Sequence, residues 1–519
     1  MKHFFCLSAL LLSGSCLGHV RADAPTPASA EAAFAAGKFD DAHKTYERLV
    51  KSDPRAAGPR LGLVRSLLRL DKWRDALREA RAATLAAPAD ADARGLLALA
   101  EMRAGRPDAA ASDSKQALSL DKDDYWGLIA AGRVAEWDAR HEESRAFFAR
   151  ATALHPERPD AWLGLWDDAD ENHLDEAEIA AARKYLALDP KGQPFDRETP
   201  YLKNFVQNQI GFWRKFETSP AFQVVGSRPD ASYTATLPIQ RAGDYVTVTV
   251  GINGQTFHLL FDTGAGGLLL SRKAAKRLAL PDLADSQVSG VQGSAPAKLQ
   301  RAETMTLGAL TLHSIPLTVI ESAGETGDGI LGGDVLDEYA VTLDFDNSTM
   351  TLMRGPGAGH MARPHTSVST LPLHTFGDHL FVSAHAQEEA AGAPDRPFWA
   401  MLDTGAETNF FSLVLTHDLS AHTIHDDWHE GSFTERTGIG NSSMKVDYCL
   451  TLAKVKLTFD GSDHVSNQIG LNGESVMDQQ ISPDSDFEIG MLLGIPILNQ
   501  HSRVTIDYPH HLLTFEDPV

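Results

Sequence analysis

The spacing of apolar residues divides the chain into two regions. Over residues 24–190 the sequence is rich in alanine, and apolar positions recur with the three- and four-residue spacing of amphipathic helices. After Tyr233 the pattern changes to alternation, which is clearest in the run Tyr-Val-Thr-Val-Thr-Val at 245–250. Such alternation predicts strands, and Asn253-Gly254 predicts a tight hairpin turn between two of them. We therefore expect a multidomain protein with an all-α region followed by an all-β region.

The helical region repeats with a period of 34 residues. One register holds proline at four of its five positions: Pro54, Pro88, Lys122, Pro156 and Pro190. The residues twelve positions before these are mostly small: Ala42, Ala76, Ala110, Ser144 and Glu178. Small side chains let two helices approach closely, and proline cannot continue a helix because it has no N–H to donate. Each period therefore predicts a pair of packed helices.

This pattern resembles the tetratricopeptide repeat, which has the same length. The resemblance implies about five repeats over residues 24–190, stacked as an α-solenoid with a concave face. Such a face would dock a peptide or a partner protein; a spacer or a support for the second region is the alternative. Residues 191–232 hold an aromatic stretch between prolines, and we expect them to form a helix on the solenoid and then a linker.

The alternating region contains one series of elements twice. An apolar strand leads into Asp-Thr-Gly in each copy, at Asp262-Thr263-Gly264 and at Asp403-Thr404-Gly405. An apolar-apolar-Gly segment follows each, at 330–332 and 492–494, and then a strand that ends in an acid and an aromatic residue. This order predicts an internal duplication into lobe one, residues 233–355, and lobe two, residues 367–519, with a linker at 356–366.

The duplicated pattern resembles the aspartic peptidases, an all-β bilobal (acid protease) fold. Alanine after each Asp-Thr-Gly is more similar to the retroviral-type and bacterial members, the retropepsin-like group, than to the pepsin type. The resemblance implies that Asp262 and Asp403 form a catalytic pair and that Thr263 and Thr404 brace the two loops. The glycines of the motif, at Gly264 and Gly405, allow the backbone to turn sharply beside the opposite carboxylate.

The chemistry explains why two acids are needed. Two carboxylates held about 3 Å apart cannot both ionise and share one proton, as is established for the aspartic proteases. The ionised carboxylate takes a proton from a bound water as general base, and its partner donates one to the peptide carbonyl as general acid. We expect no metal and no other cofactor. Asp262 and Asp403 are the residues that this mechanism assigns.

Each lobe also carries a glycine pair between its Asp-Thr-Gly and its second glycine element. These are Gly290 and Gly293 in lobe one and Gly438 and Gly440 in lobe two. Paired glycines allow a hairpin tip to open and close over a bound strand, so we expect flaps at both places; ordinary turns are the alternative. Histidines between 417 and 429 could ligate a metal, but a solvated acidic loop is the preferred interpretation.

Charge and targeting signals narrow the class further. The chain has 47 Lys and Arg against 70 Asp and Glu, a net charge of −23, of which −20 lies in residues 231–519. Nucleic-acid binders are normally basic, so that class is excluded. Lys2, a short apolar run and Val20-Arg21-Ala22 predict a signal peptide over residues 1–22 and export to the periplasm or medium. Lipid attachment at Cys16 is the alternative, and no later segment is expected to span a membrane.

The sequence thus predicts an exported aspartic endopeptidase that cuts an extended polypeptide bound as a strand under the flaps. The helical repeat would dock a partner or the substrate. A non-catalytic scaffold that holds a peptide on the same folds is the alternative function. Each lobe could also pair with a lobe of a second molecule, although the short segment between the lobes favours pairing within one chain.

Overall fold

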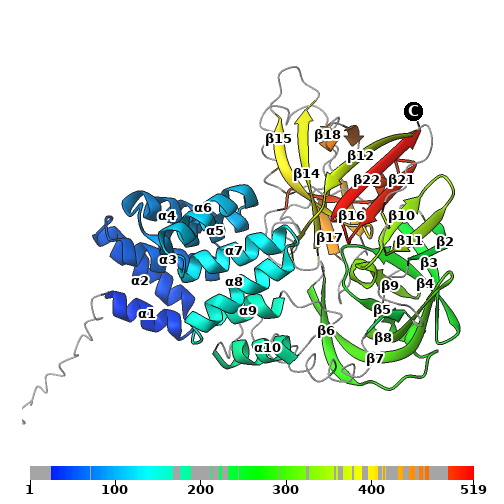
Figure 1. Ribbon diagram of the computed structural model, residues 1–519, viewed down its shortest axis with the longest axis horizontal. Helices are drawn as coiled ribbons and strands as arrows, with labels where there is room; N and C mark the ends of the chain where they lie inside the picture. The colour runs from blue at the N-terminus through cyan, green and yellow to red at the C-terminus, as the bar shows by residue number, and fades with distance from the viewer. Residues whose placement is uncertain are drawn as a thin grey trace, which may run out of the picture.

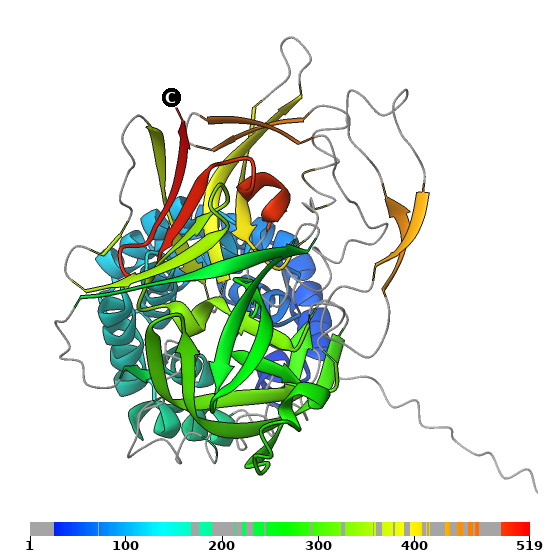
Figure 2. The ribbon, with the colours of Figure 1, turned by 90° about the vertical axis from the view of Figure 1, so that its right-hand side faces the viewer.

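The computed structural model describes most of the chain with several gaps. The described residues are 25–70, 72–167, 176–188, 212, 221–224, 232–242, 245–290, 293–322, 327–355, 358–359, 366–376, 379–388, 395–406, 412, 415, 431–435, 444–449, 455–459, 462–466 and 489–518. The long helices lie on one side of the molecule and the strands on the other (Figure 1). Turning the molecule places the helices behind the strands (Figure 2).

The described part of the helical region forms five helix pairs. Their bounds are α1 Pro27–Ala35, α2 Phe39–Ser52, α3 Ala57–Arg69, α4 Trp73–Ala86, α5 Ala91–Arg103, α6 Pro107–Leu120, α7 Tyr125–Trp137, α8 His141–Leu154, α9 Pro159–Asp167 and α10 Glu176–Leu188. The first helices of successive pairs begin at 57, 91, 125 and 159, which are 34 residues apart. The predicted helical repeat is therefore confirmed. None of the described helices is long and apolar enough to cross a membrane.

Size complementarity between helices explains the packing of the repeat. The small residues predicted at helix contacts are fully buried at Ala42, Ala76, Ala110 and Ser144. Where the second helix of a pair carries a ring, the next helix carries glycine: Tyr46 lies against Gly62, and Phe148 lies against Gly164. Each ring occupies the space that a side chain at the glycine would need, so the neighbouring helices pack closely at these positions.

Lobe one is built from strands β2 to β11. Their bounds are β2 Tyr233–Ala242, β3 Tyr245–Ile252, β4 Gln255–Asp262, β5 Leu268–Ser271, β6 Ala284–Gly290, β7 Gly293–Leu307, β8 Leu310–Ile320, β9 Gly329–Gly332, β10 Ala340–Asp344 and β11 Thr349–Arg354, with the short helices α12 Arg272–Ala275 and η1 Gly333–Leu336. The predicted turn joins β3 to β4, and both Asn253 and Gly254 have positive φ, at 47° and 76°. A two-residue turn of this kind matches the twist of the flanking strands.

Lobe two repeats the strand arrangement. Its described elements are β12 Thr366–Pro372, β13 His374–Phe376, β14 His379–Glu388, β15 Arg396–Leu402, β16 Gly431–Glu435, β17 Met444–Cys449, β18 Val455–Phe459, β19 Ser462–Ser466, β20 Met491–Leu493, α15 Ile495–Leu498, β21 Arg503–Asp507 and β22 Leu512–Pro518. In lobe one β4 pairs with β3 antiparallel and β9 parallel, and in lobe two β15 pairs with β14 antiparallel and β20 parallel. The predicted duplication is visible in this matched pairing.

The two lobes are joined within one chain by a central antiparallel pair. Strand β10 of lobe one pairs with β21 of lobe two, and Thr342 lies opposite Thr505 with their hydroxyls 2.9 Å apart. These threonines hold equivalent positions in the two copies, so a pseudo-two-fold axis passes between them. One hydrophobic core continues from lobe one into lobe two beneath this pair.

Residues 191–232 are described only at 212, 221–224 and 232. Strand β1 (Gln223–Val224) pairs with β8 of lobe one. Phe212, the described residue of the aromatic stretch, is buried in a cluster with Ala221 and Leu299, and Leu299 belongs to β7. The ring of Phe212 therefore packs on the apolar surface of lobe one. The rest of the predicted helix lies outside the described residues.

Candidate active site

The two Asp-Thr-Gly loops follow strands of identical topology. Asp262 ends β4, whose neighbour Phe261 is fully buried, and Asp403 follows β15 directly after the buried Leu402. In each lobe the strand runs parallel to its apolar-apolar-Gly strand, and the N–H of Asp403 donates to the carbonyl of Leu493 at 3.0 Å. Both acids are therefore placed at the end of a buried strand that cannot move independently of the core.

The loops bring the two carboxyl groups together. A Cβ built on Gly264 would lie 2.8 Å from Cγ of Asp403, and one built on Gly405 would lie 2.4 Å from Cγ of Asp262. Both separations are shorter than van der Waals contact, so any side chain at either glycine would displace the opposite carboxyl. The predicted close approach at both glycines is thus present in the structure.

Backbone donors orient each carboxyl group. The N–H of Gly264 donates to Oδ1 of Asp262, and the N–H of Gly405 donates to Oδ1 of Asp403, both at 2.9 Å. The two bonds are equivalent in the two lobes and are related by the pseudo-two-fold axis. Each acid is held by its own loop and faced by its partner.

The threonines connect the loops through buried hydrogen bonds. The Thr263 hydroxyl donates to the carbonyl of Leu402 at 2.9 Å, and the Thr404 hydroxyl donates to the carbonyl of Phe261 at 2.8 Å. Each hydroxyl also accepts the N–H of the other threonine at 3.0 Å. Both threonines are buried, at 1% and 0% exposure. The two threonines thus make the hydrogen bonds between the loops that the family resemblance implies.

Burial and proximity shift the protonation of the pair. Desolvation and then the charge of Asp403 raise the pKa of Asp262 well above its usual range. Desolvation also raises the pKa of Asp403, against the hydrogen bonds from Asp262 and from the backbone of Gly405. The pair therefore retains a proton at a pH where an isolated carboxyl group has lost it.

The predicted flap of lobe one is a β hairpin. Strands β6 and β7 pair antiparallel up to Gly290 opposite Gly293, with residues 291–292 between them outside the described residues. Val288 of this hairpin packs against a cluster that holds Leu260 of the strand leading to Asp262. The hairpin therefore packs, close to its tip, on the strand that leads to Asp262.

The predicted flap of lobe two and the histidine group fall largely outside the described residues. Strands β16 and β17 form a hairpin that spans the predicted tip, but Gly438 and Gly440 lie outside the described residues. The histidines between 417 and 429 also lie outside them. Over the part of the chain that is described, no group of three or more His, Cys, Asp or Glu side chains could hold a metal ion.

Two residues near the loops were not anticipated from the sequence. Both carboxylate oxygens of Asp334 accept the N–H of Gly267, at 2.7 and 2.8 Å, which fixes the chain just after the lobe-one motif. Burial raises the pKa of Tyr508 well above its usual range, and its hydroxyl lies where a Cβ on Gly333 would be 2.6 Å away. Asp334 lies two residues after the second glycine element, and that position was the available signal.

Two family models match parts of the chain. Residues 247–335, which include Asp262, match the family model described as aspartyl protease, and residues 33–100 match a tetratricopeptide repeat model. No curated protein matches the chain.

Solved structures resemble the two parts separately. An aspartic proteinase from Irpex lacteus is 13% identical, with 55% of this chain and 98% of that chain covered and a TM-score of 0.38. A thermophilic TPR protein of Thermus thermophilus is 20% identical, with coverage of 36% and 97% and a TM-score of 0.30. YrrB, a TPR protein with an unusual peptide-binding site, is 17% identical, with coverage of 31% and 84% and a TM-score of 0.22.

Proposed function

We propose that this chain, which combines tetratricopeptide repeats with an aspartyl protease domain, is an endopeptidase that cuts peptide bonds with Asp262 and Asp403. The observation that carries the proposal is the contact of each motif glycine with the opposite carboxyl group, at 2.8 and 2.4 Å from a built Cβ. This geometry makes one proton common to the two acids, which is the state that the reaction needs.

The reaction uses both protonation states of the pair. The ionised carboxylate removes a proton from a water as the water oxygen attacks the peptide carbonyl carbon. The protonated carboxyl donates its proton to the carbonyl oxygen, which gives a neutral tetrahedral diol. When the diol collapses, the C–N bond breaks, a hydroxyl proton returns to the carboxylate pair and the leaving nitrogen receives a proton. The shared proton is restored at the end of the cycle.

The braced loops supply the positioning that this chemistry requires. The reacting water must lie between two carboxyl groups whose separation is fixed to a fraction of an ångström, and misplacement of about 1 Å costs on the order of a hundredfold in rate. The four hydrogen bonds of Thr263 and Thr404 fix that separation through the backbone. The threonines therefore act on the rate through the positions of the acids.

A retropepsin-like site is the finer form of the proposal. Ala265 and Ala406 follow the two motifs, and the equivalent strands β10 and β21 pair across a pseudo-two-fold axis, as in a dimer made within one chain. The lobe-one hairpin with its paired glycines supports a mobile cover over an extended peptide. Specificity would then come from side-chain pockets on alternate sides of that peptide.

The test is cleavage of an unfolded protein at mildly acid and neutral pH, with fragments read by mass spectrometry. We expect internal cleavage by the purified full chain and none by Asp262→Asn or Asp403→Asn, with unchanged circular dichroism. Activity in either variant would contradict the assignment of the pair. A wild-type chain that binds the unfolded protein but never cuts it would favour the non-catalytic scaffold.

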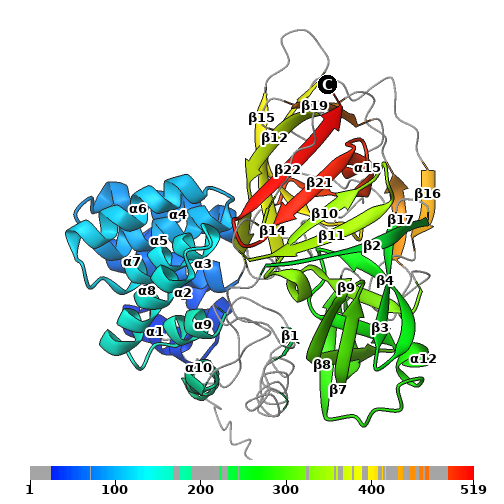
Figure 3. The same cartoon turned by 45° about the vertical axis from the view of Figure 1, so that its right-hand side comes forward.

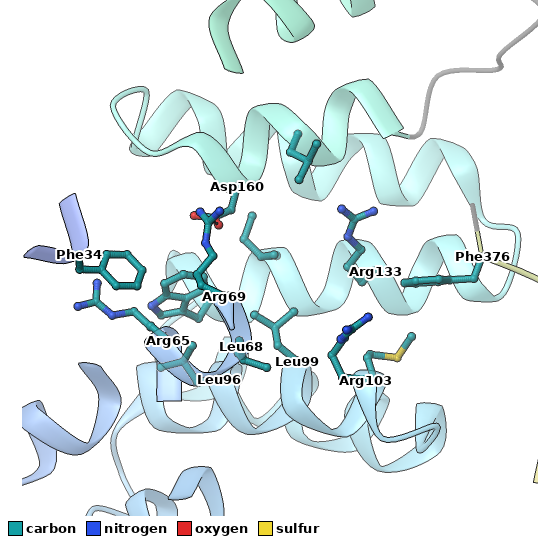
Figure 4. A pocket seen from close by; sticks show the side chains of 14 residues that line it. Phe34, Arg65, Leu68, Arg69, Leu96, Leu99, Arg103, Arg133, Asp160 and Phe376 are labelled. Atoms are coloured by element: carbon teal, nitrogen blue, oxygen red, sulfur yellow. Dashed lines mark hydrogen bonds and ion pairs between the residues drawn. The ribbon is translucent and has the colours of Figure 1, made fainter. Parts of the chain in front are cut away.

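The concave face of the solenoid supports a docking role. A hollow lies there, with an apolar floor that includes Leu68, Leu96 and Leu99. Figure 4 shows Arg65 and Arg69 at one end of this hollow and Arg103 and Arg133 at the other, where Phe376 of lobe two closes it. We propose that a protein segment with apolar side chains binds here.

A solenoid that docks the substrate and a solenoid that is only a spacer differ in their effect on the cleavage of long substrates. Phe34→Asp, at the end of the hollow away from lobe two (Figure 4), should lower kcat/KM for an unfolded protein while a short peptide is cut at the wild-type rate, because only the long chain reaches the hollow. Leu85→Asp, on α4 at a side chain that is 82% exposed, is the matched control. Equal kcat/KM for both variants on the long substrate would favour a spacer.

Export is a separate proposal that rests on the N-terminal residues. Expression of the full chain in a Gram-negative host should give a periplasmic or secreted protein that begins at Asp23. A cytoplasmic protein that keeps its first residues would contradict this proposal. A diacylated mature N-terminus at Cys16 would favour the lipoprotein alternative.

A further inference from the structure

The strands that lead to the two aspartates bury their outer faces by different means. Leu260 and Met401 hold the same position, two residues before each aspartate. The buried cluster around Leu260 comes from lobe one itself: Leu269, Ala297, Ile320 and Ile330. The buried cluster around Met401 includes residues of helices α5 and α7: Ala98, Met102, Ala130 and Val134. The solenoid thus covers in lobe two a face that lobe one covers with its own strands.

The position four residues before each aspartate shows the same divergence. In lobe one it is His258, which is exposed and contacts the Thr249 hydroxyl at 3.1 Å. In lobe two it is Trp399, whose Nε1–H donates to the carbonyl of Gly105 at 3.1 Å. Gly105 has φ of 63° in the turn between α5 and α6, so the solenoid presents this carbonyl from a fixed turn.

An aromatic cluster extends the contact to three strands of lobe two. Trp137, the last residue of α7 and 2% exposed, lies 4.7 Å from the Trp399 ring at 81° and 5.4 Å from the Phe381 ring. The His374 ring stacks on Trp137 at 4.8 Å, and the Thr375 hydroxyl donates to the carbonyl of Glu136 at 3.2 Å. Residues of strands β13, β14 and β15 therefore all contact the end of helix α7. Figure 3 shows the solenoid beside β14 of lobe two.

We propose that the helical repeat forms a wall of lobe two and that Trp137 and Trp399 are positioning residues, which hold the Asp403 strand in place against Asp262. This inference rests on the proposed peptidase function. Strand β15 passes directly from Trp399 and Met401 into the Asp403 loop, so an outward shift of the strand moves the carboxyl group with it. Gly405 lies in close contact with the Asp262 carboxyl, and an outward shift would widen this contact and separate the two carboxyl groups.

Displacement of one aspartate has a distinctive effect on pH dependence. Two close carboxyl groups titrate with one pKa below and one above that of a single acid, and this separation sets the width of the bell-shaped rate profile. If Asp403 moves away from Asp262, the two pKa values of the pair approach each other and the bell-shaped rate profile becomes narrower. Partial unfolding would lower the height of the profile without moving either limb.

The test compares Trp399→Ala with His258→Ala, the equivalent position of lobe one, in the full chain. Trp399→Ala should lower kcat on the order of a hundredfold at nearly unchanged KM, and should narrow the pH profile. Trp399→Phe keeps a ring beside Trp137 and should recover most of kcat. His258→Ala should leave kcat and both limbs unchanged. A Trp399→Ala enzyme with both limbs at their wild-type positions would overturn the proposal.

Hydrogen exchange gives a second measurement that needs no cleavage. In Trp399→Ala and in Trp137→Ala, the amides of 396–406 should exchange faster, while those of the equivalent lobe-one segment, 255–265, should be unchanged. If the amides of 396–406 exchange at the same rate in the wild type and both variants, the proposal that the solenoid forms a wall of lobe two is wrong. If the wild type cuts nothing, the peptidase function fails, and this measurement still decides whether the solenoid holds the Asp403 strand.

Discussion

The side chains of Thr263 and Thr404 exchange hydrogen bonds with each other's backbone across the centre of the molecule. Each hydroxyl accepts the partner's N–H at 3.0 Å and donates to a carbonyl of the opposite strand, at 2.9 Å for Thr263 and 2.8 Å for Thr404. Both residues are buried, so no water can replace a lost partner. The two lobes are therefore joined by polar groups at the point where the acids meet.

Thr404→Val should destabilise the protein strongly because it preserves shape and removes the hydroxyl. The Thr263 N–H and the Phe261 carbonyl would both lose their partner, at a total cost on the order of 3 kcal/mol. Thr404→Ser keeps the hydroxyl and loses one methyl group, which costs about 1 kcal/mol. Equilibrium urea denaturation of the two variants measures the difference. Equal losses would mean that packing of the methyl group, not the brace, stabilises the loops.

Asp262→Asn should make the protein more stable at neutral pH. The folded-state pKa of Asp262 is raised by burial and by Asp403, so the stabilisation from its proton is complete below the unfolded-state value of about 3.9 and is lost as the pH rises through the folded-state value. Asparagine cannot ionise and still accepts the Gly264 N–H. The melting temperature of the variant should exceed that of the wild type at pH 7 and the advantage should shrink toward pH 4. If the variant is less stable than the wild type at pH 7, the pKa of Asp262 is not raised in the folded protein by burial and by Asp403.

Local patterns with a steric meaning were sufficient to predict the repeat and the acid pair. The 34-residue register placed small residues such as Ala42 and Ser144 at helix contacts, and they are fully buried. Asp-Thr-Gly after an apolar strand requires a tight loop, and a duplicated loop requires a partner. Asp262 and Asp403 could therefore be paired from the amino-acid sequence. Both inferences depend on repetition, which a single sequence displays directly.

The contact between the solenoid and lobe two could not be predicted in this way. Trp137 and Trp399 are single aromatic residues in segments with an ordinary helical or strand pattern, and nothing in the sequence relates them to each other. Such a contact depends on the shapes of two folded surfaces. The one available signal was the difference between His258 and Trp399 at equivalent positions of the duplicated strand, since a large apolar side chain in place of an exposed polar one indicates a covered surface.

His374 should make the contact between solenoid and lobe two weaker in acid. Burial lowers its pKa, against Asp138 at 3.7 Å, the backbone of Trp137 and Asp108. A lowered histidine pKa contributes stability that is present above the unfolded-state value of about 6.5 and is lost as the pH falls through the folded-state value. His374→Phe keeps a ring on Trp137 and does not titrate. The melting temperature of the wild type should therefore fall relative to this variant between pH 8 and about pH 5. A constant difference over that range would mean that His374 does not sense pH in the folded protein.

Two glycines of helix α3 should respond oppositely to alanine. A Cβ on Gly62 would lie 2.3 Å from the Tyr46 ring, which is 3% exposed and tied by its hydroxyl to Glu31 at 2.6 Å, so the ring cannot move aside freely. Gly62→Ala should therefore destabilise the solenoid by about 1–3 kcal/mol through overpacking. A Cβ on Gly58 meets nothing within 4 Å, and Gly58→Ala should stabilise by up to about 1 kcal/mol because alanine is the better helix former. Urea denaturation followed by the helical circular dichroism signal measures both. Stabilisation by both substitutions would mean that Tyr46 finds another rotamer, and that the ring is not what requires glycine at position 62.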